Sequence, residues 1–191
     1  MNNKYIFLRH GESVSNFRDI ICSSIQNGTS PEYGLTKTGI EQVRLSSKVL
    51  KKELKNEDIV IFCSPFTRAL QTALIVKNEL DVNNFDFFVS MNLKERGFEK
   101  FELQSSKEYS TVWENDNNNL DTKGIETCKE VSNRVKELFI KLEKEYKNKT
   151  IILVSHGDTI MIARTVFLDD DAYNHRNYNF IKNAECLVFA N

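Results

Sequence analysis

The chain has 191 residues, and its 26 Lys and Arg nearly balance its 27 Asp and Glu, giving a formal net charge of −1 at pH 7. This length suits one domain with a sizeable core, and we expect a single domain over residues 1–191. The balanced charge provides no broad basic surface, so we expect no nucleic-acid partner. The 4 cysteines lie far apart in the sequence. This spacing argues against a zinc site and favours a reducing compartment.

The chain opens with a very short apolar run. Only residues 5–8 are apolar before Arg9 follows. Such a run is too short for a secretion signal or a membrane span. We therefore expect a cytoplasmic protein with no membrane partner.

Short apolar runs alternate with helical patterns along the chain. The runs do not alternate with polar residues, which is typical of strands buried in a parallel sheet. In chain order the predicted strands are residues 5–8, 59–63, 85–89, 151–154 and 186–189. Apolar spacings of three and four predict helices over residues 37–54, 67–80, 126–146 and 159–167. This order predicts an α/β fold, a three-layer α/β/α sandwich around a mostly parallel sheet.

Several other segments have weaker signals. Residues 114–121 include three consecutive asparagines and predict an exposed loop. His175 lies between Asn174 and Arg176, and we expect it to be exposed in a loop. Tyr109 and Trp113 are expected to pack in the core or in a lid.

The chemically distinctive residues follow the predicted strands. Arg9 and His10 follow the first strand, and Arg68 follows the second after Ser64. Glu95 comes shortly after the third strand, and His156 follows the fourth. Ligands of open α/β sheets bind beyond the carboxyl ends of the strands. We therefore expect these side chains to meet in one cavity.

This combination of side chains suits chemistry on a phosphate monoester. Arginine forks match phosphate oxygens and stabilise the transferring phosphoryl group. A neutral imidazole can attack phosphorus, and a carboxylic acid can protonate the leaving alkoxide. Cationic side chains can take the electrostatic role of a metal. We therefore predict a site with no metal and no cofactor.

The same residues resemble the motifs of the histidine phosphatase superfamily, whose fold is called phosphoglycerate mutase-like. The matching blocks are Arg9-His10-Gly11-Glu12-Ser13 with Asn16, Leu35-Thr36 with Gly39 and Gln42, Ser64 to Ala73, Leu93 to Phe98, Gly124-Ile125-Glu126, and Ser155-His156-Gly157. They occur in the family's order over nearly the whole chain. The sequence departs from the family at Glu99 and Leu103, where glycine is frequent, and these residues make the loop beside Glu95 bulkier and more acidic.

The resemblance implies a role for each matching residue. His10 would carry the phosphoryl group, while Arg9, Arg68 and His156 would bind its oxygens. Glu95 would act as general acid and then activate water. Two further residues would contact the substrate: Asn16 through its side chain, and Gly157 or Asp158 through a backbone N–H.

Each of these residues also has a simpler interpretation. His10 could be a surface histidine, and His156 a buried histidine with satisfied hydrogen bonds. Arg68 could pair with a carboxylate on its own helix, and Asn16 could cap a helix. Glu99 and Glu102 lie close enough in sequence to compete with Glu95 for the acid role.

Three functions remain open from the sequence. The first is a phosphatase acting on a small phosphorylated substrate or on a phosphoprotein. The second is a phosphoglycerate mutase, although the stretch from Glu95 to His156 lacks the adjacent arginine pair of those enzymes. The third is a non-catalytic adaptor that binds a phosphorylated ligand, although Arg9, His10 and Glu95 are all retained.

Overall fold

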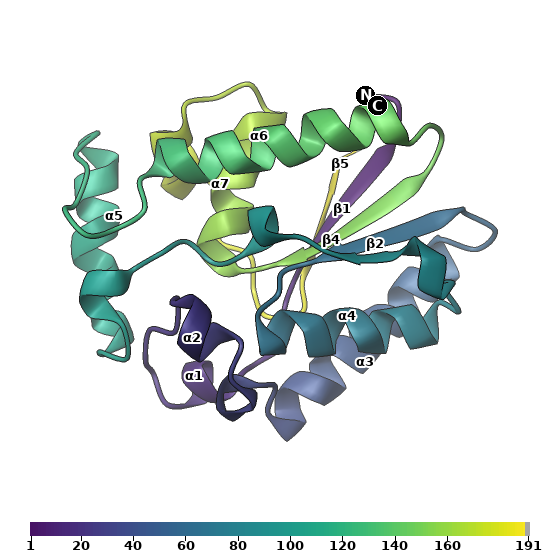
Figure 1. The fold of residues 1–191 in the computed structure, drawn as a ribbon, viewed down its shortest axis with the longest axis horizontal. Coiled ribbons are helices and arrows are strands. Elements are labelled where there is room, and N and C mark those ends of the chain that lie inside the picture. Colours follow the sequence, from purple (N-terminus) through teal and green to yellow (C-terminus); the bar gives the residue numbers. More distant parts are fainter. Residues whose placement is uncertain (190–191) are drawn as a thin grey trace.

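The computed structural model describes residues 1–189, in which five strands form one sheet (Figure 1). The strands are β1 (Lys4–Arg9), β2 (Ile59–Cys63), β3 (Phe87–Val89), β4 (Thr150–Ser155) and β5 (Cys186–Phe189). Their spatial order is β3-β2-β4-β1-β5. β5 alone runs antiparallel to its neighbour, β1. The mostly parallel sheet expected from the apolar runs is thus confirmed.

Helices cover both faces of this sheet. They are α1 (Val14–Phe17), α2 (Ile25–Gly28), α3 (Lys37–Glu53), α4 (Thr67–Glu79), α5 (Tyr109–Asn117), α6 (Cys128–Glu145) and α7 (Gly157–Phe167). Short 3-10 turns lie at Pro31–Tyr33, Asn84–Asp86, Met91–Leu93, Glu99–Phe101, Ser106–Glu108 and Ala172–Asn177. Figure 1 shows α3 and α4 on one face, with α6 and α7 on the other. Within residues 1–189, no helix combines the length and apolar character needed to cross a membrane.

Alternate residues of the central strands enter two separate cores. Tyr5 and Phe7 of β1 face α6 and α7, where Leu138 and Met161 join the same cluster. Ile6 and Leu8 face α3 and α4. All four of these β1 side chains are almost completely buried. A strand with both faces covered must be apolar throughout, and the predicted three-layer sandwich is confirmed.

The long helices begin at residues that satisfy free backbone donors. Thr36 accepts a hydrogen bond from the Gly39 N–H at the start of α3. Thr127 and Glu130 form a reciprocal capping box at the start of α6. Such caps define where a helix begins.

The loop predicted over residues 114–121 is wrong in its first half, because α5 continues to Asn117. Asp116 on α5 is buried and accepts hydrogen bonds from both terminal nitrogens of Arg96, at 2.6 and 3.0 Å. This ion pair joins α5 to the body of the protein. Asn119 then adopts a left-handed conformation with φ of 56°, which asparagine tolerates and which ends the helix.

The third predicted strand differs from expectation in length and burial. Residues 85 and 86 belong to a 3-10 turn, and β3 begins at Phe87. β3 pairs with β2 and forms an edge of the sheet. Phe88 and Val89 are therefore 37% and 54% exposed rather than buried on both faces.

The expectation that His175 is exposed is wrong. His175 is completely buried within the turn Ala172–Asn177. Ala172 and Tyr173 of that turn pack against Cys128 and Val131 of α6. This polar segment is buried because it lies across two helices, α6 and α7.

The buried pair of Arg96 and Asp116 provides a test of how α5 is held. Asp116→Asn removes one charge and leaves the Arg96 guanidinium with weakened compensation, so we expect a loss of about 3 kcal/mol in unfolding free energy. Glu41→Gln is the control, because Glu41 pairs with Arg44 on the surface and its loss should cost less than about 1 kcal/mol. Urea unfolding measures both variants, and equal losses would contradict the assignment.

Candidate active site

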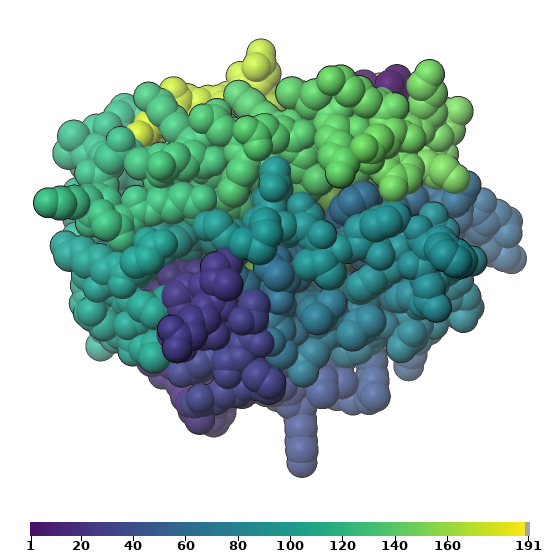
Figure 2. Space-filling view, viewed as in Figure 1, coloured from purple at the N-terminus to yellow at the C-terminus, as the bar shows by residue number. Residues whose placement is uncertain are grey.

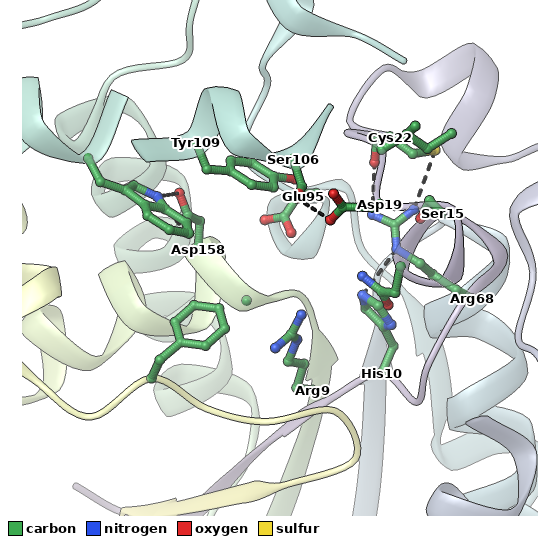
Figure 3. A pocket seen from close by; sticks show the side chains of 15 residues that line it. Arg9, His10, Ser15, Asp19, Cys22, Arg68, Glu95, Ser106, Tyr109 and Asp158 are labelled. Carbon is green, nitrogen blue, oxygen red and sulfur yellow. Dashed lines mark hydrogen bonds between the residues drawn. The ribbon is translucent and has the colours of Figure 1, made fainter. Parts of the chain in front are cut away.

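A cavity of about 210 Å³ opens beyond the carboxyl ends of the parallel strands (Figure 3). Its lining residues are Arg9, His10, Ser15, Asn16, Asp19, Ile20, Cys22, Arg68, Glu95, Ser106, Tyr109, Trp113, Gly157, Asp158 and Phe180. Six of the seven predicted site residues are among them. The seventh, His156, lies directly behind the lining, with its ring centroid 5.0 Å from that of His10.

Strand register accounts for this convergence. Arg9 at the end of β1 pairs with Ser155 at the end of β4. His10 and His156 each come one residue later, and the His10 N–H donates to the Ser155 carbonyl. Ser64 follows β2 and likewise bonds to β4, through the Val154 carbonyl. The polar residues that directly follow three parallel strands, β1, β2 and β4, therefore lie close together.

The contacts of His10 define its protonation state. Its Nδ1 lies 2.7 Å from the Gly11 carbonyl, which can only accept, so Nδ1 carries the proton. Nε2 then holds a lone pair and accepts a hydrogen bond from Arg68 Nε at 3.1 Å. Burial, together with the charges of Arg68 and Arg9, holds the pKa of His10 well below its ordinary value of 6.5. His10 is thus a buried neutral imidazole with its lone pair beside a guanidinium.

His156 has the complementary arrangement. The Ser64 hydroxyl accepts from the Phe66 N–H and lies 2.7 Å from His156 Nε2. In the tautomer in which this hydroxyl donates to Nε2, the ring proton of His156 is on Nδ1, which is buried and has no hydrogen-bond partner. Burial, with the nearby charge of Arg68, lowers its pKa as well. In that tautomer Nδ1 is a donor available to an anion.

The two arginines provide the positive charge of the cavity. Arg68 is buried and contacts His10 and Cys22, with its Nη2 2.9 Å from the Cys22 carbonyl, rather than a carboxylate on α4. Arg9 donates through Nη1 to the Ile181 carbonyl at 2.8 Å, while its buried Nε has no partner. An unpaired buried N–H is costly and marks a position for a ligand.

Glu95 is a buried carboxyl group that lines the same cavity as these cations. Its Oε1 accepts the Arg96 N–H at 2.9 Å and lies 3.3 Å from the Thr159 hydroxyl. Burial and the neighbouring Asp158 raise its pKa, while Arg68 and Arg9 oppose that shift. The competing acids are placed elsewhere: Glu99 is exposed, and Glu102 accepts hydrogen bonds from Ser23, Ser24 and Asn27.

Asn16 and Gly157 both line the cavity. Asn16 lines the cavity and also caps α1 by accepting from the Ser13 N–H, which is the simpler interpretation. Its contact with substrate stays a prediction. Gly157 is the first residue of α7. A Cβ there would lie 2.8 Å from Cζ of Phe180, so a larger residue would displace that ring.

Aromatic residues that the motifs do not include form the outer wall. Tyr109 and Trp113 stack with centroids 5.2 Å apart, and Phe180 lies 4.9 Å from the Arg9 guanidinium. Trp113 Nε1 donates to both oxygens of Asp158. The sequence signal was the four-residue spacing of Tyr109 and Trp113, which places them on one side of a helix. The expectation for Tyr109 and Trp113 was packing in the core or in a lid, and in the structure they form part of this outer wall.

Two distant segments close over the cavity. Ile20 forms a β-bridge with Ser105, and the Ser23 hydroxyl accepts from the Phe98 N–H. In Figure 2 the purple segment around α2 lies directly against the teal segment that follows Glu95. The asparagine, serine and aspartate side chains of the first segment thereby reach the cavity.

Elsewhere, residues 1–189 bring one group of possible metal ligands together, formed by Asp116, Cys128 and His175. The wide separation of the cysteines in the sequence argued against a zinc site, and this group of three side chains was not predicted. Both oxygens of Asp116 already bond to Arg96, however. A guanidinium so close to the carboxylate disfavours a bound cation.

Comparison with known proteins identifies relatives for this arrangement. Two agropine synthesis reductases of Rhizobium rhizogenes are 30% and 29% identical over 163 and 178 residues, covering 83% and 91% of this chain. These regions make up 34% and 37% of the relatives, so the chain spans about a third of their length.

Solved structures share the fold. A mycobacterial glucosyl-3-phosphoglycerate phosphatase in complex with VO3 has a TM-score of 0.82 at 18% identity, covering 98% of this chain and 92% of that chain. A phosphoserine phosphatase of Entamoeba histolytica in complex with 3-phosphoglyceric acid has a TM-score of 0.76 at 24% identity, covering 98% and 90%.

A family model decides the assignment. The model of the histidine phosphatase superfamily (branch 1) matches residues 5–190, which include the predicted motifs from Arg9 to Gly157. The chain therefore belongs to the histidine phosphatase superfamily.

Proposed function

We propose that the protein is a metal-independent phosphatase that hydrolyses phosphate monoesters through a phosphohistidine on His10. The observation that carries this proposal is the placement of His10, whose Nδ1 faces the Gly11 carbonyl and whose Nε2 lies beside Arg68 in a cavity that Arg9 and Glu95 also line. All five strands belong to one sheet, which supports a single domain over residues 1–191.

The proposed first step transfers the phosphoryl group. The Arg68 Nε–H leaves His10 Nε2 for a phosphoryl oxygen. The freed Nε2 lone pair then attacks phosphorus, and the bond between phosphorus and the ester oxygen breaks. Glu95 gives its proton to the leaving alkoxide, a role that its raised pKa supports. The free N–H groups of Arg9 and His156 are available to the phosphoryl oxygens, together with the Arg68 guanidinium.

The second step returns the enzyme to its starting state. A water molecule attacks phosphorus while the Glu95 carboxylate takes one of its protons. The bond between phosphorus and His10 Nε2 breaks, which releases inorganic phosphate and neutral His10. Arg9 and Arg68 supply the positive charge that a metal would otherwise provide, so we propose no metal in this reaction.

A small phosphorylated compound is the proposed substrate. The cavity of about 210 Å³ fits such a molecule better than a folded phosphoprotein. The structural relatives named for glucosyl-3-phosphoglycerate and phosphoserine act on compounds of this size, which supports the proposal. Hydrolysis is favoured over a mutase reaction, because within residues 1–189 Arg9 and Arg68 are the only cations that line the cavity, and a second acidic group on the substrate needs more.

The central test is covalent labelling. Brief incubation with a radiolabelled phosphate ester in the presence of chelator should leave one acid-labile, base-stable phosphoryl group on His10. His10→Ala should carry no label and lose at least about a thousandfold in turnover.

The same experiment separates the alternatives. Binding of ester without label or turnover would favour the adaptor. Interconversion of 3- and 2-phosphoglycerate far faster than any hydrolysis would favour the mutase. Loss of activity with chelator would contradict the metal-independent reaction.

Replacement of Glu95 should have an effect that depends on the leaving group. Glu95→Gln removes the proton donor, so hydrolysis of alkyl phosphates should fall about a hundredfold or more. The initial phosphorylation by p-nitrophenyl phosphate should change less than about tenfold, because nitrophenolate leaves without a proton. Rapid-quench measurement of the first turnover tests this difference, and equal losses for both esters would remove Glu95 from the acid role.

The pH profile should follow the two shifted groups. The raised pKa of Glu95 keeps its acid form above pH 4.5, so activity on alkyl phosphates should fall as pH rises through that pKa. The lowered pKa of His10 keeps the nucleophile neutral below pH 6.5. The acid limb of kcat should therefore lie below pH 6.5, and a limb at or above that pH would show a different nucleophile or a protonated His10.

A further inference from the structure

Ser64 directly follows β2, and neither step of the proposed reaction involves it. The residue is completely buried, and its N–H donates to the Val154 carbonyl of β4 at 3.0 Å. His156 lies two residues beyond Val154, and its Nε2 is 2.7 Å from the Ser64 hydroxyl oxygen. The backbone contact between the strands therefore fixes the Ser64 hydroxyl against the His156 ring.

The Ser64 hydroxyl has two hydrogen-bond contacts within residues 1–189 and one proton to give. The Phe66 N–H, at 3.2 Å, can only donate, so it uses a lone pair of the oxygen. The second contact is His156 Nε2, which can accept the hydroxyl proton. In that arrangement both contacts are complete, and the ring proton of His156 lies on Nδ1.

The opposite tautomer leaves more buried groups unpaired. A proton on His156 Nε2 would donate to the Ser64 oxygen, and the Ser64 O–H would then have no acceptor among residues 1–189. His156 Nδ1 has no partner in either tautomer. Because each unpaired buried polar group costs free energy, the contacts favour the tautomer with the proton on Nδ1.

His10 has the opposite kind of partner. Its Nδ1 faces the Gly11 carbonyl, an acceptor, so its lone pair is on the nitrogen that faces Arg68. Ser64 instead offers a donor to His156, so the unpaired nitrogen of that ring carries a hydrogen. Burial and the charge of Arg68 lower the pKa of both rings, which keeps both neutral. Two neutral histidines with centroids 5.0 Å apart thus offer a lone pair and an N–H.

We propose that Ser64 is a positioning residue that makes His156 a hydrogen-bond donor to the phosphoryl group, by holding the His156 proton on Nδ1. This inference rests on the function proposed above. Without the hydroxyl, part of the molecules would present the Nδ1 lone pair, which repels a phosphoryl oxygen. The stabilisation of the transferring group by His156 would then be reduced.

The tautomer can be measured directly, because the chain has 3 histidines. In protein labelled with 15N-histidine at neutral pH, the nitrogen shifts of His156 should show a hydrogen on Nδ1 and a lone pair on Nε2. His156→Ala assigns these signals by their loss. Ser64→Ala should move His156 toward the Nε2–H tautomer. A hydrogen on Nε2 in wild type, or an unchanged tautomer in Ser64→Ala, would overturn the inference.

Turnover provides the second readout. Ser64→Ala should lower kcat/KM for p-nitrophenyl phosphate about tenfold, as is usual when a group that orients an active-site histidine is removed. Ser47→Ala is the matched control, because Ser47 is also completely buried and donates to the Val43 carbonyl on α3, outside the cavity lining. It should stay within about twofold of wild type. Thermal unfolding checks that each variant is folded.

A double-mutant cycle separates positioning from a general loss of structure. If Ser64 acts through His156, adding Ser64→Ala to His156→Ala should change kcat/KM by less than about twofold. Full activity of Ser64→Ala, or an equal loss in both backgrounds, would overturn the inference and leave the phosphatase intact. Absence of turnover by wild type, with no label on His10, would overturn the proposed function and this inference with it.

Discussion

The hydrogen bond from Arg68 Nε to His10 Nε2 is the contact on which the site depends. It joins a buried permanent cation to a buried lone pair, and it can form only while His10 is neutral. The Gly11 carbonyl on the other side of the ring holds the remaining proton on Nδ1. The protein thus keeps an imidazole lone pair next to the charge that would attract a phosphate.

The sheet makes this contact possible. His10 follows β1 and Arg68 lies in the first turn of α4, after β2, with β4 between the two strands. Burial of Ile6 and Leu8 against α3 and α4 fixes β1 relative to those helices. The positions of the polar side chains therefore depend on apolar packing a few residues away. A change of register in β1 would separate His10 from Arg68, since neighbouring residues face opposite sides.

The motifs allowed the inner part of the cavity to be predicted. Arg9, His10, Arg68, Glu95 and His156 all follow predicted strands, and the rule that parallel strands end at one edge brings them together. Apart from Tyr109 and Trp113, whose spacing fits one side of α5, the outer part was not predicted, because its residues belong to segments without periodicity. Asp19 lines the cavity because the next residue, Ile20, forms a β-bridge with Ser105. No local sequence pattern predicts such a long-range pair. The burial of His175 and the length of α5 have the same origin, since Arg96 and Asp116 pair across separate elements.

A structure with bound orthovanadate tests the convergence of these side chains most directly. We expect vanadium bonded to His10 Nε2, with Arg9, Arg68 and His156 on its equatorial oxygens and Glu95 at the apical oxygen opposite. Vanadate bonded to another atom, or held in a place that Arg68 and Glu95 do not reach, would contradict this expectation.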